Sequence, residues 1–236
     1  MIKLLDNIKR VRKRLENAAS KCQRSSKDIT LLAVSKTRSA QMIRQAAEYG
    51  IHSFGENYLQ EALQKMSELQ SLSLDWHFIG PIQSNKTRQI AENFSWVHSI
   101  DRVKIACRLD NQRPANMQKL NICLQVNIDN EISKSGFKMD EVEPAVKEIL
   151  DLPNLQLRGF MAIPRYQDKF DAQRKPLAKL RKLIDKVNDS LDNSNKLDTL
   201  SMGMSSDLEA AVFEHATIVR VGSDIFGNRE PKQKFK

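Results

Sequence analysis

Residues 29–50 read ITLLAVSKTRSAQMIRQAAEYG, an apolar run followed by a segment in which apolar side chains recur every three or four positions. The apolar run predicts a buried strand over 29–34, and the spacing after it predicts a helix over 39–49. Gly50 suits the position just after a helix, where the backbone often turns left-handed. This stretch therefore predicts a strand, a short loop that carries Lys36, and a helix.

The same unit recurs along the chain. Further strands are predicted at 51–54, 75–79, 95–99, 121–128, 156–163, 199–202 and 216–221. Helices are predicted at 57–70, 84–93, 101–110, 139–150, 169–190 and 206–214. Strands that alternate with helices pair in parallel through right-handed crossovers, and eight such units favour a closed (β/α)₈ barrel over an open doubly wound sheet.

Residues 1–21 precede this pattern. Their apolar side chains fall on one helical face, which consists of Leu4, Ile8, Val11, Leu15 and Ala18. We therefore expect one barrel domain over residues 1–236 with an additional N-terminal helix that caps it.

The composition is typical of a soluble protein, with 40% hydrophobic and 28% charged residues. No apolar stretch approaches the roughly 20 residues of a membrane span. Cys22, Cys107 and Cys123 are odd in number and form no CxxC pair, which favours a reducing compartment. The N-terminus lacks the apolar core and cleavage site of a secretory signal. We expect a cytoplasmic protein that does not associate with membranes.

The net charge of +9 raises the alternative of nucleic-acid binding. Five of these charges fall in residues 1–21 and three in the basic tail 229–236, which leaves one for the rest of the chain. A basic stripe across a folded face would need charge in the middle of the chain. Only weak, non-specific binding through the termini stays open as an alternative.

Catalytic and binding residues of a (β/α)₈ barrel lie at the carboxyl ends of its strands. Those positions here are Ser35, Lys36, Gly55, Glu56, Asn57, Gly80, His98, Asn127, Ala162, 203–206 and 222–224. The runs GMSSD (203–207) and VGSD (221–224) place glycine and serine after the last two strands, where this fold most often holds a phosphate. The alternative is that the serines cap a helix and Gly222 makes a turn.

A lysine at a strand mouth can act as a Schiff-base nucleophile. Three features together indicate a site for a phosphorylated aldehyde cofactor: Lys36 after the first strand, glycine and serine loops after the last two strands that could hold a phosphate, and Arg220 beside these loops. Pyridoxal 5′-phosphate (PLP) meets that description. An arginine that faces its pyridine nitrogen would keep this nitrogen unprotonated and weaken the ring as an electron sink.

Several runs resemble the pyridoxal phosphate homeostasis proteins, also called the proline synthase co-transcribed family. They are LLAVSKT, FGENYLQE, WHFIGPIQSNK, SKSGF, RGFMAIP, LSMGMSSDLEAAV and TIVRVGSDIFGNR, and they extend from about residue 29 to residue 229. The resemblance implies a barrel like the N-terminal domain of alanine racemase, with PLP as an aldimine on Lys36. It further implies phosphate contacts from Ser205, Ser206, Gly222 and Ser223, Arg220 at the pyridine nitrogen, and Asn57 beside the ring.

The family binds PLP and balances its free and enzyme-bound pools without an established reaction. Racemases of this barrel type use a second acid or base on the opposite face of the cofactor, supplied through a further domain and a dimer partner. The chain ends eight residues after Asn228, and we therefore expect no second domain, no catalytic residue and a monomer. Apo forms of PLP-dependent enzymes and free amino acids are the expected partners. The alternative is a PLP-dependent amino-acid racemase or lyase of low activity.

Residues 80–87, GPIQSNKT, differ from the P-loop pattern by Asn85 in place of its second glycine. Pro81 also removes a backbone donor, so we disfavour a nucleotide triphosphatase and interpret Lys86 as a surface lysine at a helix start.

The four histidines lack metal-site spacing, and we expect no metal ion. His98 is expected near the mouth of the barrel, in contact with a strand-end carbonyl or the cofactor. Lys134 is expected to be solvated, with a second aldehyde-reacting amine as the alternative.

Overall fold

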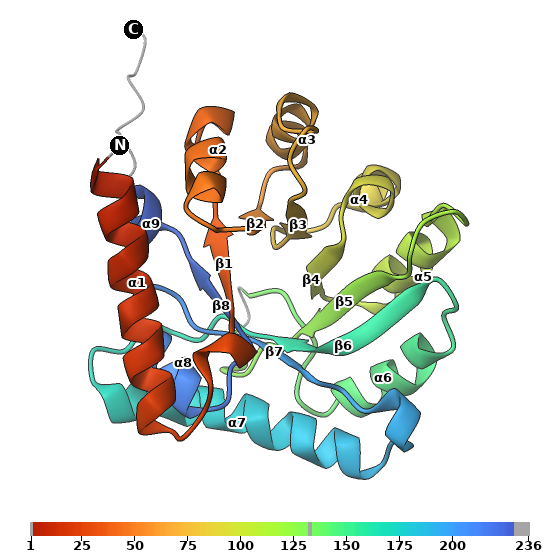
Figure 1. The fold of residues 1–236 in the computed structure, drawn as a ribbon. Helices are drawn as coiled ribbons and strands as arrows, with labels where there is room; N and C mark the ends of the chain where they lie inside the picture. Colours follow the sequence, from red (N-terminus) through yellow and green to blue (C-terminus); the bar gives the residue numbers. More distant parts are fainter. Residues whose placement is uncertain (1, 132–133, 229–236) are drawn as a thin grey trace, which may run out of the picture.

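The computed structural model describes residues 2–131 and 134–228, and they form a closed barrel of eight parallel strands with helices on its outside (Figure 1). The strands are β1 (Thr30–Val34), β2 (Ser53–Glu56), β3 (Asp75–Phe78), β4 (Trp96–Ile100), β5 (Leu120–Gln125), β6 (Leu155–Met161), β7 (Thr199–Ser201) and β8 (Ile218–Val221). They pair in sequence order, and β8 closes the ring against β1 with Leu32 opposite Arg220.

The helices of the described residues follow the strands in alternation. They are α1 (Ile2–Lys21), α2 (Ala40–Glu48), α3 (Leu59–Glu68), α4 (Thr87–Asn93), α5 (Val103–Gln112), α6 (Val142–Leu150), α7 (Phe170–Asp189), α8 (Leu208–Phe213) and α9 (Ser223–Phe226). Short 3₁₀ turns occupy Ser26–Asp28, Ser84–Lys86 and Asn193–Asn195. The predicted (β/α)₈ barrel is thus confirmed.

Strand β5 ends three residues earlier than predicted, and β2 is shifted by two residues, so that it includes Gly55 and Glu56. Glycine and glutamate are weak strand formers. Glu56 nevertheless extends the strand because its buried carboxylate is paired with Lys65 of α3. Helix α9 was not predicted, because four residues are too few to show helical periodicity.

Helix α1 lies along the outside of the barrel beside α8 and α9 (Figure 1). All five residues of its predicted apolar face are buried, and Ile8 and Val11 are fully so. Burial of such a side chain contributes about 1.5–3 kcal/mol, so this face binds the helix firmly to the barrel. The basic residues of α1 remain on its other faces, and Arg14 among them reaches α8 and α9.

No helix among the described residues is both long and apolar enough to span a bilayer. The basic tail 229–236 lies outside the described residues.

Candidate functional site

A pocket of about 460 Å³ opens at the carboxyl ends of β1, β7 and β8. It is lined by Val34, Lys36, Arg38, Met204, Ser205, Ser206, Arg220, Gly222, Ser223, Gly227 and Asn228. Six of the seven residues predicted for the cofactor site therefore meet in one cavity, although Lys36 follows the first strand and the other five follow or belong to the last two strands. They meet because adjacent parallel strands end at the same rim.

The turn that carries Lys36 is held on both sides of that residue. Ser35 donates its N–H to the carbonyl of Gly55 at 3.0 Å, and its own carbonyl accepts from Lys65 Nζ at 2.8 Å. Thr37 has a left-handed φ of +65°, which is strained for a β-branched residue, and donates its N–H to Glu61 Oε1 at 2.5 Å. These contacts fix the backbone on either side of the half-buried Lys36.

Lys65 connects these contacts in a buried ionic cluster behind the turn. Its Nζ lies 2.6 Å from Glu56 Oε1 and 2.5 Å from Glu61 Oε1, and Ser35 Oγ donates to the same Glu56 oxygen at 2.7 Å. Glu56 has no exposed surface, and its second oxygen, Oε2, has no hydrogen-bond partner among the described residues. Burial raises the pKa of Glu56 despite its contact with Lys65.

The first serine loop depends on Gly203, the second residue after β7. Its φ is +90°, and a Cβ at this position would lie 2.4 Å from the Cβ of Ala211. Both the dihedral and the space therefore require glycine. Asp207 follows as the residue before α8, but its Oδ1 accepts the N–H of Met204 at 2.7 Å instead of capping the helix. This contact closes a tight turn that directs Ser205 and Ser206 into the pocket wall.

The second loop is Gly222–Ser223, where β8 leads into the first residue of α9. A Cβ on Gly222 would lie 3.3 Å from the carbonyl oxygen of Val34, so a larger residue would crowd the first strand. Ser223 Oγ donates to Ser205 Oγ at 3.2 Å and joins the two loops. Two hydroxyls and the first turn of a helix, where N–H groups lack intrahelical acceptors, offer donors suited to a phosphate.

Arg220 forms the inner wall of the pocket and is only 4% exposed. Its Nη1 donates to the carbonyl of Ser201 at 2.5 Å and to Ser201 Oγ at 3.0 Å, and its Nη2 donates to the carbonyl of Ala162 at 3.0 Å. Burial lowers the pKa of Arg220 to about 10, which leaves the guanidinium protonated at neutral pH. The site thus has a fixed, buried cation.

Two histidines lie behind Arg220, inside the barrel. Ser201 Oγ lies 2.7 Å from His98 Nδ1, and His98 Nε2 lies 2.9 Å from His77 Nδ1. Burial lowers the pKa of His77 to about 3 and that of His98 well below its ordinary value, so both imidazoles are neutral. The expected contact of His98 with a strand-end carbonyl is not found, because both of its ring nitrogens lie against side chains inside the barrel. A contact of His98 with the cofactor stays a prediction.

These residues fit a phosphorylated aldehyde. The pocket combines a lysine amine, three serine hydroxyls beside a glycine that leaves room for close approach, and a buried cation. No Asp, Glu, His, Cys or Tyr occurs among the described residues that line it. The charge of the lining is therefore positive, as a phosphate requires.

Asn57, the seventh predicted residue, does not line this pocket. It borders a smaller one of about 220 Å³ on the far side of the barrel mouth, together with Asn127 and Lys134. Asn57 Oδ1 is buried without a hydrogen-bond partner among the described residues. Lys134, expected to be solvated, forms an ion pair with Glu131 and donates to the carbonyl of Ile163 at 3.2 Å.

The P-loop-like run after β3 has a conformation that does not suit phosphate binding. Thr87, at the position of the hydroxyl that would bind a metal ion, is fully buried and donates to the carbonyl of Ser84 at 2.9 Å. Arg108 donates to the same carbonyl at 3.0 Å. The loop therefore closes on its own backbone. Lys86 ends the 3₁₀ turn before α4 and is half-buried.

Some site residues were missed by the sequence reasoning. Arg38 lines the pocket and donates to the carbonyl of Gly227 at 2.5 Å, and its place two residues after Lys36 could have indicated it. Lys65 gave no signal, because its spacing in α3 is that of any surface lysine. The contact between His77 and His98 was also missed, although both occupy the centres of neighbouring strands. No three His, Cys, Asp or Glu side chains in the described part of the chain are grouped to hold a metal ion.

Comparison with known proteins places the chain in a family. Residues 5–230 match the family model of the alanine racemase N-terminal domain. The pyridoxal phosphate homeostasis protein of Pseudomonas aeruginosa is 52% identical over 98% of this chain and 97% of that protein.

Solved structures agree with the sequence match. PipY of Synechococcus elongatus, solved with PLP bound, is 34% identical, with a TM-score of 0.79 over 91% of this chain and all of that one. Alanine racemase of Corynebacterium glutamicum has the same fold over 62% of its length, with a TM-score of 0.70 at 16% identity. The chain therefore belongs to the pyridoxal phosphate homeostasis protein family and has the barrel of the alanine racemase N-terminal domain.

Proposed function

We propose that this protein binds PLP in the pocket at the ends of β1, β7 and β8 and takes part in the intracellular balance of the cofactor. The observation that carries the proposal is the convergence of Lys36, Arg220 and the two serine loops on one cavity. The PLP-bound PipY structure at 34% identity supports the same ligand for this chain. When bound, PLP supplies an aldehyde that an amine can capture reversibly and a ring that withdraws electrons.

Each of the seven residues predicted for the cofactor site has a defined part in this proposal. Lys36 holds the aldehyde covalently, Ser205, Ser206, Gly222 and Ser223 hold the phosphate, and Arg220 faces the pyridine nitrogen. Arg220 is suited to that part because its guanidinium is fixed by two carbonyls and stays charged at neutral pH. A cationic donor there keeps the ring nitrogen unprotonated. Asn57 is proposed to lie beside the ring, from the far side of the barrel mouth.

We propose a carrier that buffers PLP and delivers it, and not an enzyme. Two-face proton transfer to an amino acid needs a second acid or base opposite the lysine. The titratable side chains among the described lining residues are Lys36 and two arginines, Arg38 and Arg220, and an arginine does not exchange its proton near neutral pH. These lining residues support reversible binding of PLP and not catalytic turnover of an amino acid.

The remaining parts of the proposal concern the cellular setting. We propose one barrel domain that acts as a monomer in the cytoplasm, with apo PLP-dependent enzymes and free amino acids as the acceptors of PLP. Free cysteines at positions 22, 107 and 123 are consistent with a reducing compartment.

Transfer and turnover assays test the carrier. Purified protein loaded with PLP is mixed with the apo form of a PLP-dependent enzyme, and the recovery of that enzyme's activity is followed. The expected result is recovery with wild-type protein and none with a Lys36→Ala variant treated identically. Racemisation or lyase activity well above trace level on a panel of amino acids, abolished in Lys36→Ala, would contradict the carrier proposal.

A further inference from the structure

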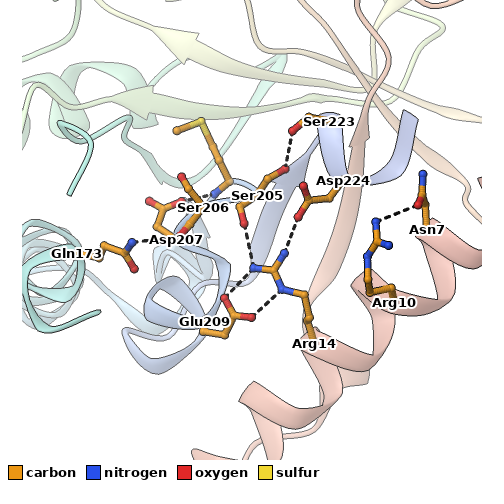
Figure 2. A network of polar contacts seen from close by, with 11 residues as sticks. Asn7, Arg10, Arg14, Gln173, Ser205, Ser206, Asp207, Glu209, Ser223 and Asp224 are labelled. Atoms are coloured by element: carbon orange, nitrogen blue, oxygen red, sulfur yellow. Dashed lines mark hydrogen bonds and ion pairs between the residues drawn. The ribbon is translucent and has the colours of Figure 1, made fainter. Parts of the chain in front are cut away.

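The two serine loops, 203–206 and 222–223, together form what we call the serine cradle. Arg14 of α1 contacts Ser205 in the first loop and Asp224, the residue that follows the second loop (Figure 2). Its Nε and Nη2 donate to the two oxygens of Glu209 at 2.7 and 2.8 Å, its Nη1 donates to Asp224 Oδ2 at 2.5 Å, and its Nη2 also donates to the carbonyl of Ser205 at 2.9 Å. Glu209 lies in the first turn of α8 and Asp224 in the first turn of α9. One guanidinium thus joins α1 to α8 and α9, whose contact residues lie 195 and 210 positions further along the chain.

The contacts place Arg14 directly behind the cradle. Ser205, whose carbonyl accepts from Arg14, also accepts at its hydroxyl from Ser223, and Ser223 is followed immediately by Asp224. The hydroxyls on the pocket side and the guanidinium on the outer side therefore tie the same two loops together. A fork of this kind fixes direction as well as distance, which a single hydrogen bond does not.

The carboxylates near the cradle would disfavour a bound phosphate if Arg14 did not compensate their charge. Glu209 and Asp224 suit the N-terminal ends of α8 and α9, but each would repel a phosphate bound at those ends. Arg14 compensates both carboxylates, and the pKa of Glu209 lies below its ordinary value chiefly because Arg14 donates to it. Without Arg14 both carboxylates would lose their ion pair behind the phosphate.

We propose that Arg14 is a positioning residue for the cofactor phosphate. It holds the two serine loops at one separation and offsets the charge of Asp224 and Glu209, and in this way sets the preference of the pocket for phosphorylated over unphosphorylated aldehydes. This inference rests on the proposed PLP site. It gives α1 a part in ligand binding beyond that of a capping helix.

The test compares wild-type protein with Arg14→Gln and with Arg12→Gln as a matched control. Arg12 lies two residues earlier on the same helix and donates to the carbonyl of Gly50, away from the cradle. Dissociation constants are measured for PLP, pyridoxal and inorganic phosphate. Arg14→Gln is expected to weaken PLP and phosphate binding about tenfold or more, which corresponds to about 1.4 kcal/mol, and to change pyridoxal binding less than about twofold. Arg12→Gln is expected to leave all three constants unchanged.

An equal loss of PLP and pyridoxal affinity in Arg14→Gln would overturn the inference, because it would show a general disturbance of the fold. Unchanged affinity for PLP and phosphate would overturn it as well. If Arg14→Gln does not fold, Arg14→Lys, which keeps the charge but not the fork, is judged by the same ratio of PLP to pyridoxal affinity. Failure of the proposed function gives a different result, because wild-type protein would then bind neither PLP nor pyridoxal at Lys36. The affinity for inorganic phosphate in wild type and Arg14→Gln would still test the role of Arg14.

Discussion

Replacement of Lys65 by methionine removes the cation at the centre of the buried cluster behind Lys36. Glu56 then keeps a fully buried carboxylate whose Oε2 already lacks a partner, and it loses the 2.6 Å contact at Oε1. Removal of one member of a buried ion pair costs about 3–5 kcal/mol of unfolding free energy. Typical domains have a total of about 5–15 kcal/mol, so Lys65→Met is expected to be severely destabilised at pH 7.

The loss in Lys65→Met depends on pH in a defined direction. Burial raises the pKa of Glu56, and the protonated form therefore stabilises the fold at low pH, a contribution that is lost as the pH rises through the folded-state pKa. Without Lys65 that pKa rises further, since the compensating charge is gone. The difference between variant and wild type is expected to be largest at neutral pH and to shrink as the pH falls toward the ordinary glutamate value.

Urea denaturation followed by circular dichroism at several pH values measures this effect. The exposed Lys104 of α5, replaced by methionine, is the control and is expected to change the unfolding free energy by less than about 0.5 kcal/mol. The double variant Lys65→Met with Glu56→Gln is expected to recover most of the loss, because no fully buried carboxylate then lacks its cation and Glu61 remains partly exposed to water. A loss below about 1 kcal/mol in the single variant, or no recovery in the double variant, would refute the reasoning about the buried pair.

Two further predictions concern the first serine loop and the buried histidines. Gly203→Ala places a Cβ at a left-handed φ and 2.4 Å from the Cβ of Ala211, and it is expected to lower the free energy of unfolding by about 2–4 kcal/mol. The control Gly227→Ala, with φ +83° but nothing within 4 Å, is expected to lower it by about 1 kcal/mol. Equal losses for the two variants in thermal and urea unfolding would contradict the proposed clash. His77 and His98 have lower pKa values in the folded protein than the unfolded-state value of 6.5. Their contribution to stability is therefore present above pH 6.5 and is lost as the pH falls. The free energy of unfolding is expected to decline below pH 6.5 by up to about 1.4 kcal/mol per pH unit for each histidine. A stability that stays flat between pH 7 and pH 5 would be incompatible with two neutral buried imidazoles.

The barrel and most of the pocket were predictable from the sequence, because they follow from periodicity and from the ends of strands. Once eight strand and helix units were recognised, Lys36, Ser205 and Gly222 had to lie at the same rim. The contacts of His98 were not predictable, because they join side chains of β3, β4 and β7 that meet only inside the closed barrel.

Contacts between elements were beyond sequence reasoning. The partners of Arg14 are 191 to 210 residues away, and neither its helix position nor its neighbours along the chain indicate them. The cluster around Lys65 is hidden for the same reason: a glutamate inside β2 and a lysine on α3 meet only after the helix packs on the barrel. Pairs of this kind follow from packing geometry, which no local pattern specifies.

The most direct test of the central proposal is the identification of the lysine that captures PLP. Purified protein is incubated with PLP, reduced with borohydride to make the bond permanent, digested, and mapped by mass spectrometry. The proposal predicts a reduced pyridoxyl group mainly on Lys36, with loss of that adduct and of the bound-cofactor absorbance in Lys36→Ala. An adduct mainly on another lysine, such as Lys134, or undiminished binding by Lys36→Ala would contradict it.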